Sequence, residues 1–114
     1  MKSLNSMLSK KERNAVTEFK DTLASKVGNS LLEIILFGSK ATGYSTPYSD
    51  LDLLVILSEV TVAYKEIIYD VAVDVNLKYD VVISPVIYSQ QIYYSNYLKD
   101  TCFYKTTVLE GISI

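Results

Sequence analysis

Two aspartates, Asp50 and Asp52, stand two residues apart at the start of an apolar segment of this 114-residue chain. Side chains at alternate positions of a strand point to the same side, so the two carboxylates project together, about 7 Å apart at the backbone. Two carboxylates held this close repel one another, and a divalent cation between them relieves the repulsion. The pair therefore indicates a metal site, most often Mg²⁺ carrying a nucleoside triphosphate.

A candidate phosphate-binding turn precedes the aspartates. Gly38 and Ser39 follow the apolar run Leu31–Phe37, and ten residues separate Ser39 from the first aspartate. Glycine lets the backbone turn sharply and approach a ligand, and Ser39 is predicted to begin a short helix whose N-terminus favours anions. Lys40 adds a positive charge. Taken singly, each motif is more often an ordinary turn or cap, but taken together they indicate phosphoryl or nucleotidyl transfer.

Gly38-Ser39, the spacer of ten residues and Asp50-Leu51-Asp52 resemble the signature of the DNA polymerase β-like nucleotidyltransferase superfamily. Within it, the short chain is similar to the minimal nucleotidyltransferase (MNT) group, over about residues 31–114. The resemblance implies an α/β (α+β) fold, a small mixed β-sheet with flanking helices, and transfer of AMP from ATP with Mg²⁺. Members of this group are commonly encoded beside a HEPN-domain toxin and act as its antitoxin. The acceptor implied is a hydroxyl of that toxin, in particular a tyrosine.

The resemblance also implies roles for single residues. Asp50 and Asp52 would bind one or two Mg²⁺, while Gly38, Ser39 and Lys40 would hold the β- and γ-phosphates. Two metal-bound carboxylates at the start of a strand suit this chemistry, because a rigid element fixes the metal geometry.

Relatives use a third acidic residue on a neighbouring strand, and Asp80 matches it by position and by the strand predicted for 80–83. It would complete the metal site and align the acceptor hydroxyl. Asp70 and Asp74 match less well, because they fall inside a predicted helix. One departure concerns Thr42, where many relatives have a basic residue, so that Lys40 would carry the phosphate contact alone.

Two alternatives to an active transferase antitoxin stay open. The chain could neutralise a HEPN toxin by binding alone, although the intact Asp50, Asp52 and Asp80 count against this. It could also modify a small molecule, but it lacks the extra domain with which such relatives hold their acceptor.

Composition predicts a single domain over residues 1–114, with 49% hydrophobic and 21% charged residues. No apolar run is long enough to span a membrane, and residues 1–11 lack the apolar core of a signal peptide. One cysteine and no histidine exclude an internal disulfide, Ser-His or Cys-His catalysis and most zinc sites. These features predict a cytoplasmic protein, as a monomer or within a homo- or hetero-oligomer.

Charge is spread unevenly along the chain. Residues 1–27 contain six basic and three acidic residues, and residues 28–114 contain five and ten, for a net charge of −2. The basic segment is too sparse for a nucleic-acid footprint, so no direct nucleic-acid binding is expected.

Hydrophobic periodicity predicts alternating helices and strands. Ser9 and Glu12 have the S-x-x-E spacing of a capping box, which begins a helix that Gly28 ends. The apolar runs 31–37 and 51–57 predict buried strands, joined by turn residues at 43–49. Further predictions are a helix at 61–77, a strand at 80–83, a short helix from 89, a helix at 101–110 and an edge strand at 112–114.

The helix predicted for 61–77 carries an acidic row, Glu66, Asp70 and Asp74, spaced four residues apart. The row is either a solvated face or a docking surface for a basic partner. The chain also contains ten tyrosines. Some of these rings must fill the core, and an exposed subset would mark a partner surface.

Overall fold

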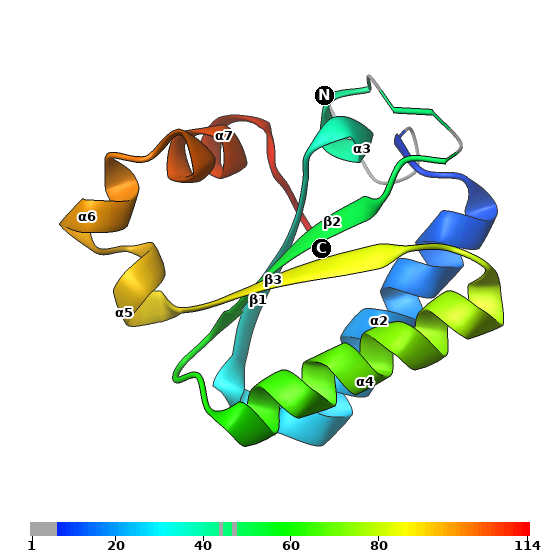
Figure 1. Cartoon of the computed structure of the whole chain (residues 1–114), viewed down its shortest axis with the longest axis horizontal. Helices are drawn as coiled ribbons and strands as arrows, with labels where there is room; N and C mark the ends of the chain where they lie inside the picture. The colour runs from blue at the N-terminus through cyan, green and yellow to red at the C-terminus, as the bar shows by residue number, and fades with distance from the viewer. Residues whose placement is uncertain (1–6, 44, 47) are drawn as a thin grey trace.

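The computed structural model describes residues 7–43, 45–46 and 48–114. Tyr44 and Pro47 of the predicted loop, and the first six residues of the segment tested for a signal peptide, lie outside this part. In it, helices alternate with the strands of one sheet (Figure 1). The helices are α2 (Lys10–Val27), the 3-10 turn η1 (Gly28–Ser30), α3 (Ser39–Thr42), α4 (Val62–Tyr79), α5 (Gln90–Tyr93), α6 (Asn96–Lys99) and α7 (Cys102–Glu110), and the strands are β1 (Leu31–Phe37), β2 (Leu51–Leu57), β3 (Ile83–Ser89) and β4 (Ile112–Ser113).

The sheet is mixed, with the strand order β3-β2-β1-β4. β1 pairs antiparallel with both β2 and β4, whereas β2 pairs parallel with β3. β2 is therefore a central strand, and its residues after Asp52 are all buried. This confirms the predicted mixed sheet with flanking helices, and it places the aspartates at the N-terminal end of a rigid strand.

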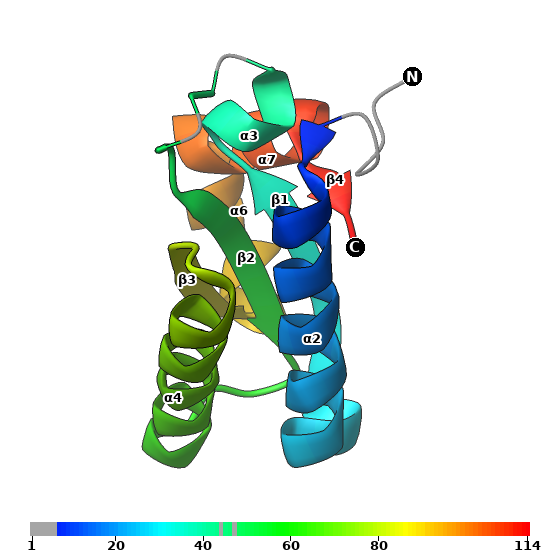
Figure 2. The same ribbon diagram turned by 90° about the vertical axis from the view of Figure 1, so that its right-hand side faces the viewer.

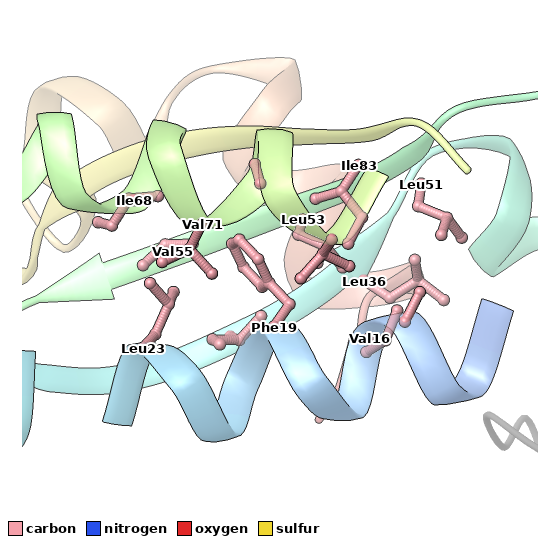
Figure 3. Close-up of a cluster of buried hydrophobic side chains, with 14 of the residues drawn as sticks. Val16, Phe19, Leu23, Leu36, Leu51, Leu53, Val55, Ile68, Val71 and Ile83 are labelled. Atoms are coloured by element: carbon pink, nitrogen blue, oxygen red, sulfur yellow. The ribbon is translucent and has the colours of Figure 1, made fainter. Parts of the chain in front are cut away.

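Two long helices, α2 and α4, pack side by side on one face of the sheet (Figure 2). Their apolar stripes meet the inward side chains of β1 and β2, and the ring of Phe19 extends from α2 towards Leu53 and Val71 (Figure 3). The predicted capping box begins α2, because Ser9 and Glu12 each bond the backbone N–H of the other. This core fixes β2, and so the direction in which its aspartates point.

The other face of the sheet carries a smaller aromatic cluster beneath α5, α6 and α7. Tyr93 is buried there and its hydroxyl shares a hydrogen bond with Thr107. The Phe37 and Phe103 rings meet edge to face, 5.3 Å apart between centroids, which ties α7 to the end of β1. Some tyrosines thus fill the core, as predicted.

The strand predicted for 80–83 is wrong. Helix α4 continues to Tyr79, and Asp80 ends it in the left-handed conformation with φ 53°, which aspartate tolerates better than most residues. The amide side chain of Asn76 then bonds the backbone N–H and C=O of Ile83, where β3 begins. Pro85 does not end β3, because a proline without an N–H fits an edge strand.

None of the helices among the described residues has the length and apolarity needed to cross a membrane.

We expect Phe19→Ala to lower the free energy of unfolding by about 3–5 kcal/mol, because it leaves a cavity in a fully buried site. The exposed Tyr97 provides a control, since Tyr97→Ala removes an aromatic ring from solvent. Urea unfolding followed by circular dichroism measures both. Equal stability of the two variants would contradict the position of Phe19 in the core.

Candidate active site

The turn after β1 lies directly against the Asp52 carboxylate. Phe37 and Asp52 are paired residues of the antiparallel strands, so the next residue, Gly38, passes over the aspartate. Gly38 has a φ of +74°, and a Cβ added to it would overlap the Asp52 Oδ2. Glycine is required here both for the backbone angle and for the space. The two motifs that the sequence places together are therefore in contact.

Asp50 and Asp52 share this end of the sheet. Burial raises the pKa of the Asp52 carboxyl, and the neighbouring charge of Asp50 raises it further. Asp50 is exposed and accepts a hydrogen bond of 3.1 Å from the Ser84 hydroxyl. Ser84 is also the partner of Asp52 in the parallel register of β2 and β3. Sequence reasoning missed Ser84, because it placed the third strand three residues too early.

Ser39 is the first residue of α3, directly beyond the glycine. The Gly38 carbonyl accepts hydrogen bonds from the backbone N–H groups of Ala41 and Thr42, which closes this single turn. The Thr42 hydroxyl donates to the Ser39 carbonyl at the far end of the turn. Thr42 thus stabilises the turn, and phosphate binding by Gly38 and Ser39 stays a prediction.

Lys40 is buried in an ion pair with Glu12 of α2. Its Nζ lies 2.7 Å from the Glu12 Oε2 and donates a 3.0 Å hydrogen bond to the carbonyl of Thr46. Burial raises the pKa of the Glu12 carboxyl, but the hydrogen bonds from Lys40 and Ser9 outweigh burial, and the pKa is lowered. Lys40 therefore connects α3 to α2 and to the loop before Asp50. A contact between Lys40 and a phosphate would require this ion pair to open, and the contact stays a prediction.

Asp80 is exposed at the end of α4, where its carbonyl accepts a hydrogen bond from the Lys11 Nζ. Among the residues that the structure describes, no three acidic, cysteine or histidine side chains gather as a metal site. Asp80 therefore does not join Asp50 and Asp52 in a cluster of three carboxylates. The strand argument for Asp80 fails, and its role as third metal ligand stays a prediction.

A cavity of about 760 Å³ lies between the N-terminal end of α2, α3 and the start of β2. The Lys40–Glu12 pair forms part of its wall, and Asp50 and Asp52 do not line it. A Mg²⁺ ion that carries phosphates needs carboxylate ligands close to one another, which Asp50 and Asp52 supply, so we assign the candidate site to the carboxylate pair and not to this cavity. Its lining residues include Lys11, Thr46, Ser49, Leu51, Asp80 and Val82.

The carboxylate pair fits a Mg²⁺ ion. Magnesium prefers oxygen ligands and usually keeps several waters, with one or two carboxylates and substrate phosphates completing its shell. Asp50 and Asp52 supply the carboxylates, and a cation beside them would offset the burial and the charge of Asp50 that raise the pKa of Asp52. A third protein carboxylate is not needed for such a shell.

The chain is similar in sequence to known proteins of one family. The profile of the nucleotidyltransferase domain family matches residues 16–108. A protein of Methanocaldococcus jannaschii named "Putative protein adenylyltransferase MJ0604" is 34% identical over 100 residues, covering 88% of this chain and 94% of the relative. A second protein of the same organism, named "Putative protein adenylyltransferase MJ0141", is 38% identical over 78 residues, covering 68% of this chain and 79% of the relative.

Solved structures share the fold. A mutant of the toxin-antitoxin MntA-HpeT superposes with a TM-score of 0.56 at 18% identity, covering 90% of this chain and 70% of that chain. A toxin-antitoxin crystal structure with AMP-PNP gives a TM-score of 0.56 at 20% identity, covering 88% and 69%. The chain belongs to the nucleotidyltransferase domain family and is a nucleotidyltransferase, which confirms the resemblance drawn from Gly38-Ser39 and Asp50-Leu51-Asp52.

We expect the Asp52 carboxyl to titrate above its ordinary value of 3.8. The folded chain then holds this proton more tightly than the unfolded chain, so the free energy of unfolding falls as pH rises through the window above 3.8. Asp52→Asn should therefore be more stable than wild type above this window and equally stable below it. Carbon-13 NMR of the Asp52 carboxyl measures the pKa, and a value at or below the ordinary one would contradict the account.

Loss of one partner of the buried ion pair should be costly. We expect Glu12→Gln to lower the free energy of unfolding by on the order of 3 kcal/mol, because Lys40 then stays buried without a counter-charge. Glutamine still caps the helix, so this loss does not come from the cap. The double variant Glu12→Leu/Lys40→Met should lose less.

The exposed pair between Glu18 and Lys78 is the matched control for this experiment. Glu18→Gln should change the urea midpoint little, since solvent screens that pair. A Glu12→Gln midpoint equal to that of Glu18→Gln would show that the Lys40–Glu12 pair does not hold the turn.

Proposed function

We propose that this chain transfers AMP from ATP, with Mg²⁺, to a hydroxyl of a partner protein. The observation that carries the proposal is the contact between the Gly38 turn and the carboxylate of Asp52, with Asp50 beside it. A metal held by the two carboxylates would lie next to the backbone at which phosphates are expected.

The residues of the chain would bind and orient the reactants. Asp50 and Asp52 would provide the metal ligands, and Ser84 would hold Asp50 by its hydrogen bond. Ser39 would offer its N–H and hydroxyl to the phosphates. Bound Mg²⁺ would neutralise the charge that develops on the phosphate oxygens.

The transfer itself exchanges one bond for another. The acceptor oxygen forms a bond to the α-phosphorus of ATP, the bond from that phosphorus to the bridging oxygen breaks, and pyrophosphate leaves with the electron pair. The hydroxyl proton passes to a carboxylate of the site or to water. Asp80, by family resemblance, would align the acceptor hydroxyl.

The acceptor proposed is a tyrosine hydroxyl of a cognate HEPN toxin, so that the chain acts as an antitoxin in the cytoplasm. Relatives named as protein adenylyltransferases support a protein acceptor. Solved structures of toxin-antitoxin proteins, one of them with AMP-PNP, support the toxin and the nucleotide. A small domain also offers little room to enclose an acceptor of its own.

A second candidate is neutralisation of the toxin by binding without catalysis. Two observations favour it: Lys40 is occupied by Glu12, and Asp80 does not join the carboxylate pair. Transfer to a small molecule has no supporting observation in the structure.

We expect the chain, incubated with ATP, Mg²⁺ and a cognate HEPN toxin, to add one or more AMP groups to that protein. Asp50→Asn/Asp52→Asn should bind the partner but transfer at least about 10²-fold more slowly, because both metal ligands lose their charge. Intact-mass spectrometry of the partner measures the transfer. Asp21→Asn, an exposed position on α2, is the control.

The same variants separate the two candidates. If Asp50→Asn/Asp52→Asn protects cells from the toxin as fully as wild type, neutralisation is by binding. If it still transfers AMP at the wild-type rate, the carboxylate pair is not the catalytic site. Asp80→Asn and Ser84→Ala, measured in parallel, test the two supporting roles.

A further inference from the structure

Helix α4 is apolar on two opposite faces. Its inner face packs Ile68, Val71 and Val75 into the core. Its outer face presents a ridge of four apolar side chains, seven and four residues apart, that are between 48% and 80% exposed. A helix at the surface of a monomer is normally polar on its outer side, and exposed apolar ridges mark interaction sites. The ridge consists of Val62, Tyr69, Val73 and Leu77.

One flank of this ridge is acidic. Glu66, Asp70 and Asp74 lie at successive turns beside it, and all three are exposed. Within the described part of the chain, none of these carboxylates takes part in an ion pair or a hydrogen bond with another side chain. Three unneutralised charges along an apolar ridge define the chemistry of the surface that fits it: apolar in the middle and basic at one side.

A second copy of this chain fits the ridge poorly. Two copies of α4 packed antiparallel would set one acidic row against the other, which opposes association. Packed parallel, each acidic row would face the flank with the single Lys65. Charge complementarity therefore favours a different protein, with lysines or arginines beside its apolar stripe.

The ridge leads to the carboxylate pair. Leu77, at its end, is followed by the helix cap Asp80 and then by Val82, whose carbonyl accepts the backbone N–H of Leu51. Ser84, two residues further, donates to Asp50. A protein that docks along α4 would therefore reach the aspartates at the end of the helix.

We propose that the outer face of α4 is the docking surface for the acceptor protein, which contributes an amphipathic helix with an apolar stripe flanked by lysine or arginine. This inference rests on the proposed function, since it names how the acceptor of that reaction is recognised. Docking on α4 brings the acceptor hydroxyl towards Asp50 and Asp52.

The test measures binding apart from catalysis. A cognate HEPN toxin, the acceptor in the proposed function, is titrated by calorimetry with Asp50→Asn/Asp52→Asn, alone and with Val73→Ser/Leu77→Ser or with Glu66→Lys/Asp70→Lys/Asp74→Lys added. We expect each added set to weaken binding at least about tenfold, and the charge reversal to make binding strengthen, instead of weaken, as salt is added. The matched control, Val108→Ser/Leu109→Ser, changes two apolar residues of similar exposure on α7 and should stay within about twofold.

The outcomes that overturn the inference differ from the one that overturns the proposed reaction. Binding that withstands both α4 sets, or a wild-type chain that binds no such protein, excludes α4 as the docking surface. A wild-type dimer that sediments as a monomer after Val73→Ser/Leu77→Ser would make a second copy the occupant. Weakened binding by the α4 variants with no AMP transfer by wild type would overturn the proposed reaction and leave the docking surface standing.

Discussion

The close contact between Gly38 and the carboxylate of Asp52 is the constraint on which the site depends. Antiparallel pairing of β1 and β2 brings the turn over the aspartate, and only a residue without a Cβ leaves room for it. The same contact partly buries Asp52 beside Asp50, which raises its pKa. The fold thus holds an unfavourable charge arrangement at the end of a rigid strand, as sites that bind cations commonly do.

Around this contact, ion pairing and helix packing fix the remaining parts. The buried pair of Lys40 and Glu12 joins the turn to α2, so the long helices that form the core also hold the candidate phosphate turn. Lys40, next to the glycine-serine turn, therefore stabilises the structure through Glu12, and a phosphate would have to compete with Glu12 for it. Helix α4 ends near the start of β2, where the carbonyl of Val82 accepts a hydrogen bond from the backbone N–H of Leu51. This connection brings the exposed apolar ridge of α4 towards the aspartates.

Local signals made most of the fold predictable. The apolar runs of β1 and β2, the capping box of α2 and the turn α3 each lie within a few residues, and their predicted bounds agree with the structure. The sequence predicts Asp80 in a strand, whereas it ends helix α4, because an aspartate before an apolar run is typical both of a strand start and of a helix cap. The Asn76 bridge to Ile83 decides between them, and it forms only in the folded chain. The ion pair of Glu12 with Lys40 and the hydrogen bond from Ser84 to Asp50 could not be predicted for the same reason, because the partners are distant in sequence.

The central claim is that Asp50, Asp52 and the Gly38 turn together bind a metal–nucleotide complex. Paramagnetic broadening by Mn²⁺ with AMP-PNP, followed in the amide NMR spectrum, tests it most directly, because broadening falls steeply with distance from the ion. The account predicts that the amides of Gly38, Ser39, Asp50 and Asp52 broaden first, and that Asp50→Asn/Asp52→Asn abolishes the effect. Broadening centred on the acidic row of α4, or unchanged in that variant, would contradict it.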